Sequence, residues 1–258
     1  MIHANAALAE RIERASAALG RDAVQAHRAL FVDSEAASLD CGSGVAVFLN
    51  EDSPLTQVRG AGGAEFSLDE VEQFFTERMT PVIFTLTPFA QPALWTQLAA
   101  RGYEFGTFEN VMVRAVSPAD AAEAGFVQEA ADPLAWSRTL AETFFGSVTP
   151  MGLDLCRTLY AIPSCRNVCV PGEEAPVAGA QLDVRDGLAV FQCDGTAPAC
   201  RGMGLHTAMI RARLAMAAEA GCDLATADTA PGSQSQRNYE RAGFQVAYTK
   251  VTLVKPCF

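Results

Sequence analysis

The sequence has few of the residues that build metal sites or disulfide frameworks. Only His3, His27 and His206 are histidines, and the eight cysteines form no C-x-x-C pair and have no histidine at zinc-ligand spacing. We therefore expect no metal cofactor, and mostly buried free thiols in a reducing compartment. Cys165 and Cys169 leave open a metal or redox pair, although further ligands for it are scarce.

Basic residues and long apolar runs are also scarce. Nineteen basic and 30 acidic residues give a net charge of −11, whereas a protein that binds nucleic acid needs a basic surface, so we expect no such partner. No apolar run reaches the ~18 residues that span a bilayer. Residues 1–21 do not resemble a signal peptide, and 255–258 carry no lipidation motif. These features predict a cytoplasmic protein without membrane contact and leave its oligomeric state unknown.

The chain contains an internal repeat. Residues 81–114 have the same layout as 222–255 at a constant offset of 141, so that Gly102 aligns with Gly243. Each copy has the pattern of a strand, a helix, a Gly-aromatic turn and a final strand. A repeat this long favours duplicated domains over a solenoid, whose units have ~20–50 residues. We expect the seam at 117–125, where small and polar residues replace the apolar pattern.

Both halves have mixed helix and strand patterns. Ser67 begins a capping box, and Asp132 is a candidate N-cap. In the first half we expect helices at 6–19, at 24–30 and after Ser67, with strands at 45–49 and 55–59. In the second half we expect helices at 133–145, 151–160 and 205–219, with strands at 126–129, 167–170, 177–184 and 188–193.

The sharpest local signal is the segment 196–210, a loop that leaves a strand and enters a long helix. Its small residues allow backbone N–H groups to converge on an anion, and the helix N-terminus adds partial positive charge. Arg201 can add a charge-assisted hydrogen bond. No acidic residue occurs in the first turn. This pattern predicts a phosphate-binding loop; the alternative is a tight turn with an exposed arginine.

The segment Arg201-Gly-Met-Gly204 resembles the R-x-x-G-x-G/A loop of GNAT acetyltransferases, which binds the pyrophosphate of coenzyme A. Pro198 and the segment from Tyr239 to Phe244 are similar to the same family. The resemblance implies an α/β (α+β) fold of two tandem GNAT-like domains, each a mixed, mostly antiparallel sheet flanked by helices. It predicts a degenerate domain at 1–117 and an acyl-CoA binding domain at 126–258.

The resemblance also implies the residues that hold acetyl-CoA. The final Gly/Ala of the family loop is His206 here, and its imidazole could bind a phosphate or point out of the helix. The predicted cofactor-binding residues are Thr196, Arg201, Gly202, Met203, Gly204, Leu205, His206, Thr207 and Asn238.

Acetyl transfer needs a neutral amine, a polarised carbonyl and a proton for the departing thiolate. Tyr239 matches the position of the family's proton donor, with packing on the sheet as the alternative. Asp194 and Asp228 are candidate bases, and a water relay is equally compatible. Cys193 could carry an acyl group covalently, but a buried strand thiol is the simpler interpretation.

The first half contains a formal copy of the loop, residues 59–64. The helix that follows it opens with Asp69, Glu70 and Glu72, which would repel a pyrophosphate. The repeat offset places Leu98 where the second copy has Tyr239. We therefore expect this half to bind no cofactor and to shape an acceptor cleft or an interdomain interface.

The leading hypothesis is an N-acetyltransferase that moves an acetyl group from acetyl-CoA directly to a small-molecule or peptide amine. Residues 1–125 hold 17 acidic and 8 basic residues, a net charge of −9, which favours a cationic acceptor. A non-catalytic acyl-CoA binding or sensing protein is the alternative. A pure interaction domain without any cofactor is a further one.

Overall fold

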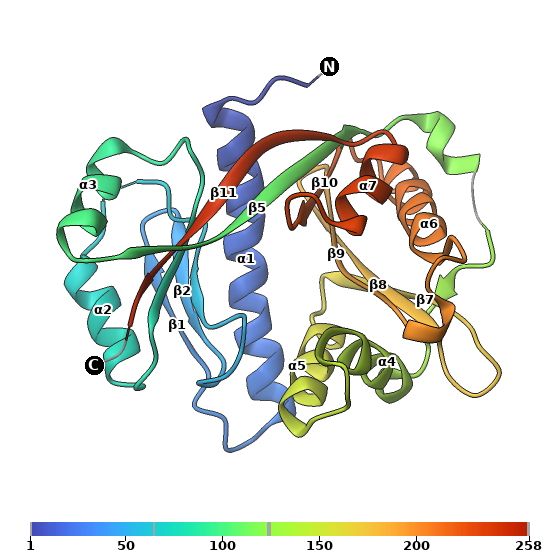
Figure 1. Cartoon of the computed structure of the whole chain (residues 1–258), viewed down its shortest axis with the longest axis horizontal. Coiled ribbons are helices and arrows are strands. Elements are labelled where there is room, and N and C mark those ends of the chain that lie inside the picture. Colours follow the sequence, from blue (N-terminus) through green and yellow to red (C-terminus); the bar gives the residue numbers. More distant parts are fainter. Residues whose placement is uncertain (1, 64, 123–124, 257–258) are drawn as a thin grey trace. The chain divides into compact units, whose positions relative to one another are not determined.

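The computed structural model describes residues 2–63, 65–122 and 125–256. The chain forms two compact units: the first comprises residues 3–110 and those from 248 onward, and the second comprises residues 111–247. Each unit contains a mixed sheet flanked by helices, as the sequence predicts (Figure 1). Within the described part of the chain, no helix is long and apolar enough to cross a membrane.

The first unit is built on a sheet with the strand order β1-β2-β3-β4-β11-β5. Strands β1 to β3 are antiparallel, β3 and β4 are parallel, and β4 and β11 are antiparallel. Its elements are α1 (Ala6–Leu30), β1 (Ala37–Cys41), β2 (Gly44–Phe48), β3 (Gln57–Arg59), α2 (Leu68–Thr76), β4 (Val82–Leu86), α3 (Pro92–Ala100) and the first part of β5 (Glu104–Ala115).

Strand β2 is buried on both faces and organises this core. Ala46 and Phe48 pack with α2 and α3 in the main apolar cluster. Val47 faces α1, where a Cβ on Gly20 would lie only 2.9 Å from its side chain. The prediction of two helices at 6–19 and 24–30 is therefore wrong: α1 is continuous, and Gly20 permits close approach to the sheet rather than ending the helix. Strand β1 was not predicted.

The second unit has the strand order β5-β10-β9-β8-β7-β6, in which β9 and β10 are parallel and β9 to β6 are antiparallel. Its elements are the end of β5, a 3-10 turn (Pro118–Ala122), β6 (Gln128–Glu129), α4 (Pro133–Phe145), α5 (Pro150–Tyr160), β7 (Cys165–Val170), β8 (Ala178–Arg185), β9 (Leu188–Thr196), a 3-10 turn (Pro198–Cys200), α6 (Leu205–Glu219), β10 (Leu224–Thr229), α7 (Gln234–Arg241) and the start of β11 (Gln245–Lys255).

Helices cover both faces of this second sheet. Ile210 and Leu214 of α6 join Phe191 in one core cluster with Tyr239 of α7. On the other face α4 lies so close that a Cβ on Gly179 or Gly195 would clash, the latter at 2.5 Å from Leu140. The N-cap side chains expected at Ser67 and Asp132 are both confirmed.

The internal repeat is confirmed by the elements, because the offset of 141 residues maps β4, α3 and β5 onto β10, α7 and β11. The two copies nevertheless exchange strand ends. The end of β11 pairs with β4, and the end of β5 pairs with β10. For this reason the compact units divide at 110 and 247, and they differ from the sequence division into 1–117 and 126–258. Residues 123 and 124 of the seam lie outside the described residues.

Candidate functional site

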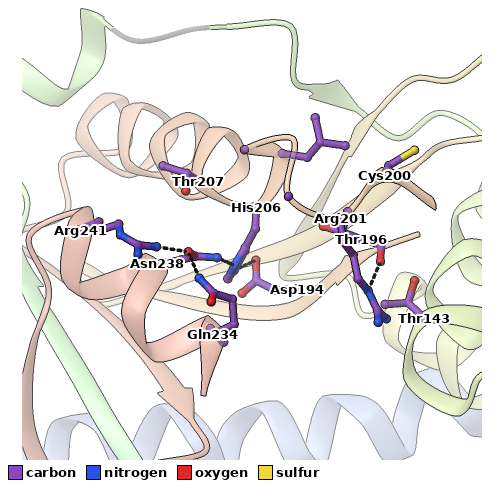
Figure 2. A pocket seen from close by; sticks show the side chains of 14 residues that line it. Thr143, Asp194, Thr196, Cys200, Arg201, His206, Thr207, Gln234, Asn238 and Arg241 are labelled. Atoms are coloured by element: carbon purple, nitrogen blue, oxygen red, sulfur yellow. Dashed lines mark hydrogen bonds and ion pairs between the residues drawn. The ribbon is translucent and has the colours of Figure 1, made fainter. Parts of the chain in front are cut away.

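A cavity of about 750 Å³ opens at the start of α6 in the second unit. Gly202 and Gly204 give the loop its shape, with φ of +80° and +79°. A Cβ on either would meet nothing within 4 Å, so these glycines serve the left-handed backbone and leave the space open. The cavity is lined by Thr143, Asp194, Thr196, Cys200, Arg201, Gly202, Gly204, Leu205, His206, Thr207, Gln234, Ser235, Asn238 and Arg241 (Figure 2).

The start of α6 has the features of an anion site. Its N-cap, Gly204, has no side chain to accept hydrogen bonds from the first-turn amides, and no acidic residue occurs in that turn. Two arginines border the cavity: Arg201, whose Nε donates to the carbonyl of Thr196 at 3.3 Å, and Arg241, whose Nη1 donates to Asn238 at 3.1 Å (Figure 2). Free amides and two cations together favour a phosphate-bearing ligand.

Asp194 is the carboxylate among the lining residues, and it belongs to a buried polar cluster. The hydroxyl of Tyr239 donates to its Oδ2 at 2.5 Å, and the guanidinium of Arg213 donates to its Oδ1. Burial is the largest single effect and raises the pKa of Asp194, but the charge of Arg213 and the contributions of His206 and Tyr239 together outweigh burial and lower the pKa to about 2. Asp194 is therefore an ionised carboxylate at neutral pH and a weak base.

His206 points toward Asp194 and Asn238 (Figure 2). Asn238 Oδ1 accepts hydrogen bonds from Gln234 and Arg241, so its amide Nδ2 donates to His206 Nδ1 at 2.9 Å. The proton of a neutral His206 must then lie on Nε2, which is 3.3 Å from Asp194 Oδ1. The alternative that His206 points out of the helix is wrong, because Asn238 and Asp194 hold the ring from both sides.

The two strands beside the cavity diverge. Strands β9 and β10 are in register from Leu188 to Phe191 and from Leu224 to Ala227. Beyond these residues β9 continues to Thr196 and β10 to Thr229 without further registered pairs in the described sheet. Cys193 has a positive φ of 59° at this point, and the pairing of β9 with β8 shifts register there, between the partners of Gly179 and Gln181. The divergence leaves room between adjacent strands.

Most of the predicted cofactor residues line the cavity. The exception is Met203, which is 68% exposed. Among the predicted catalytic residues, Asp194 lines the cavity, Asp228 is exposed outside the lining, and Tyr239 is 1% exposed behind Asp194. Burial raises the pKa of Cys193 well above the usual value, so its thiol is a poor nucleophile.

Sequence reasoning missed several residues of the site. Thr143 comes from α4, whose proximity to the loop no local pattern reveals, and the same holds for Gln234, Ser235 and Arg241. Cys200 lies within the predicted loop but was not among the predicted cofactor residues. Arg213 carried a usable signal: it lies four residues after Met209 and four before Ala217, on the apolar face of the helix. A charge on a buried helical face implies a buried partner. In the described residues no group of three or more His, Cys, Asp or Glu side chains could hold a metal ion.

The chain has the GNAT fold. It is similar to a GCN5-related N-acetyltransferase from Kribbella flavida, with 20% identity, a TM-score of 0.65, and coverage of 96% of this chain and 95% of that one. It is also similar to a tandem GNAT protein from the clavulanic acid biosynthesis pathway, with 11% identity, a TM-score of 0.59, and coverage of 92% and 88%. No protein-family model matches the sequence, and neither does any curated protein.

Proposed function

We propose that the second unit binds acyl-CoA, with acetyl-CoA as the first choice, and transfers the acyl group to an amine. The observation that carries this proposal is the cavity at the uncapped start of α6, bordered by Arg201 and Arg241 and adjacent to the divergence of β9 and β10. The GNAT fold, which the chain shares with a protein named as an N-acetyltransferase and with a tandem GNAT protein, supports the same conclusion.

The pyrophosphate of coenzyme A fits the start of α6. The amides from Gly202 to Thr207 supply donors, and the helix dipole supplies partial positive charge. Arg201 adds a charge-assisted hydrogen bond. The cavity carboxylate, Asp194, is neutralised by Arg213 and therefore does not oppose an anion.

The pantetheine arm fits between the diverging strands. Its two amides can pair with the backbone groups of β9 and β10 that the sheet leaves without registered partners, as buried peptide groups require. Thr229, at the end of β10, also has a buried hydroxyl without a hydrogen-bond partner in the described residues. A ligand with amide groups would satisfy such atoms.

In the transfer step the amine nitrogen attacks the thioester carbonyl, a C–N bond forms and the C–S bond breaks. One proton leaves the amine and one reaches the thiolate. We assign the second proton to Tyr239, whose hydroxyl borders Asp194 and whose phenolate Arg213 Nη2 would stabilise from 3.4 Å. Because Asp194 is a weak base, the amine proton passes to water, with Asp228 at the end of β10 as the remaining carboxylate candidate.

The acceptor we propose is a small-molecule or peptide amine with positive charge, since the acidic residues concentrate in the first half of the sequence. We propose the first half as a GNAT-like copy that binds no cofactor. The relative named a tandem GNAT protein supports the duplicated arrangement.

A non-catalytic acyl-CoA binding protein is the second candidate. One observation favours it: Tyr239 is buried and its proton is donated to Asp194, while Asp194 is held by Arg213. In such a protein the same cavity would bind acyl-CoA without releasing thiol.

The deciding experiment combines calorimetry with a thiol-release assay. We expect coenzyme A to bind the wild-type chain, and acetyl-CoA to release free thiol only when an amine from a broad panel is present. Binding without amine-dependent release across the panel would favour the second candidate. Absence of binding would contradict both and leave an interaction domain.

A further inference from the structure

Arg213 of α6 is fully buried beneath the cavity, and all three of its guanidinium nitrogens donate hydrogen bonds. Nε donates to the carbonyl of Met209 at 3.2 Å, and Nη1 donates to the carbonyl of Gln181 at 3.0 Å. The ring of Phe191 lies 4.5 Å from the guanidinium carbon. A buried charge is costly unless it is paired, and the counter-charge of Arg213 is Asp194.

Asp194 is the link between this buried cation and the cavity. The groups that face its carboxylate are Arg213 and His206 from α6 and Tyr239 from α7. On its own strand the neighbouring thiol is Cys193, which stays protonated because burial raises its pKa. One carboxylate thus accepts the hydrogen bond of the Tyr239 hydroxyl and lies 3.3 Å from His206 Nε2, a buried atom without a hydrogen-bond partner in the described residues.

We propose that Arg213 is a positioning residue of the acyl-transfer site: it keeps Asp194 a carboxylate, so that Tyr239 and His206 remain proton donors aimed at one acceptor. This proposal rests on the proposed function, because its main test measures the turnover of acyl transfer. In it Asp194 orients Tyr239 and His206 and does not abstract the proton of the amine.

The opposing effects at Asp194 support this assignment. Burial is the largest single effect and raises the pKa of Asp194; the charge of Arg213 is the largest opposing effect, and together with His206 and Tyr239 it more than offsets burial. Burial also raises the pKa of Tyr239, and the adjacent Asp194 raises it further, so the phenol keeps its proton. The proton therefore lies on Tyr239 and not on Asp194.

Without the charge of Arg213, Asp194 would no longer stay deprotonated. Asp194 would take one proton from solvent and become a carboxylic acid, whose O–H can donate to the oxygen of Tyr239. The hydroxyl proton of Tyr239 would then lose its acceptor, and His206 would lose the anion beside Nε2. Turnover would acquire a dependence on the ionisation of Asp194 that the wild-type protein lacks.

The test compares R213M, R213K, D194N and the double variant R213M/D194N, with R211M as the matched control on the exposed face of the same helix. The measured quantity is the ratio of kcat of each variant to wild type from pH 5 to 9, so that protonation of the amine substrate cancels. We expect R213M to lose at least tenfold in this ratio as the pH falls through a midpoint between about 5 and 8, the range of a buried unpaired carboxyl group. The dissociation constant for acetyl-CoA should change less than threefold.

The other variants separate positioning from packing. R213K keeps the charge and should show a flat ratio, as should R211M. In R213M/D194N the pH dependence should disappear, since the titrating group is gone. A flat ratio for R213M, or a pH dependence that persists in the double variant, would overturn the proposal and leave Arg213 as a packing residue.

A readout without turnover keeps this proposal distinct from the proposed function. In R213M the pKa of Asp194 is raised on folding, so the free energy of unfolding relative to R213M/D194N should fall as the pH rises from 4 to 8. If it stays constant, the proposal fails even in an active enzyme. If R213M is unfolded at pH 7, a folded double variant supports charge neutralisation, and an equally unfolded one overturns it.

Discussion

Two loops of this chain fit the same R-x-x-G-x-[GAH] pattern, and the second of them lines the cavity at the start of α6. In the first loop, residues 59–64, a Cβ on Gly60 would lie 2.5 Å from the backbone oxygen of Glu13 in α1. In the second loop, residues 201–206, a Cβ on Gly202 or Gly204 would meet nothing within 4 Å. The first loop uses its glycine for packing against a helix, and the second uses its glycines to shape an open surface. Ala64, the end of the first loop, lies outside the described residues.

The helices that follow the loops differ in the same sense. The first turn of α2 contains Asp69 and Glu70, and the Ser67 side chain accepts a hydrogen bond from the Glu70 amide. The first turn of α6 has neither an acidic residue nor a side-chain cap. An anion site therefore depends on unoccupied amides and the absence of competing carboxylates, and the pattern of letters alone does not distinguish the two loops.

The strongest test of this comparison is the stoichiometry of binding. We expect calorimetry to give one molecule of coenzyme A per chain, because only the second loop combines open space with free helix amides. Two equivalent sites would show that the first loop opens in solution and would remove the basis of the comparison.

Gly204→Asp should abolish measurable binding of coenzyme A, a loss of more than about 100-fold in affinity. The substitution puts a negative charge where phosphates approach, at a φ of +79° that non-glycine residues rarely adopt. Gly62→Asp is the matched control in the first loop, where a Cβ also has open space. It should leave the affinity within about twofold; an equal loss in both variants would mean that the effect is not local.

Tyr239→Phe should lower kcat by ~10–1000-fold and leave the affinity for acetyl-CoA nearly unchanged. The ring and its packing on Phe244 remain, and the proton is lost. The equivalent residue of the first copy, Leu98, is fully buried and apolar, so L98M serves as a control without effect on turnover. A wild-type kcat in Tyr239→Phe, measured where chemistry limits the rate, would assign Tyr239 to packing and the proton to solvent.

Arg201→Ala should weaken the binding of coenzyme A by about 1–3 kcal/mol, the value of one charged hydrogen bond. Arg201 is exposed, and within the described residues its side chain donates to the carbonyl of Thr196 alone, so stability should change little. Arg59→Ala is the corresponding change in the first loop. Because Arg59 donates to Ser16 at 3.2 Å, this variant should lose thermal stability and keep its affinity for coenzyme A. Calorimetry and thermal unfolding of both variants check this crossed pattern.

The sequence predicted those features that depend on local chemistry. The cap at Asp132, the helix at 205–219 and the repeat offset of 141 residues all depend on neighbouring residues or on spacing, and the structure confirms them. Thr196 and most of the residues from Arg201 to Thr207 were found because small residues, a cation and a helix start occur together in one segment.

Features that depend on distant partners could not be predicted in this way. The continuity of α1 through Gly20 was not predicted, because the contact of Gly20 with β2 is invisible along the chain. The end of β11 pairs with β4 and the end of β5 pairs with β10. Because the two copies have the same sequence pattern, the sequence does not show which of these two strands each end joins. The pairing of Arg213 could not be predicted, since its partner Asp194 is 19 residues away on another element.

The exchange of strand ends between β5 and β11 has a consequence for dividing the gene. A fragment that begins at residue 126 lacks Met112 from its core and the strand that pairs with the outer side of β10. The complementary fragment lacks β11, which lies between β4 and β5 in the first unit. Each fragment alone would present an unpaired, aggregation-prone edge. When the two fragments are expressed together, the unpaired edge of each can pair with the other. A cut at 117–125 is therefore better suited to a split-protein reporter than to the preparation of isolated domains.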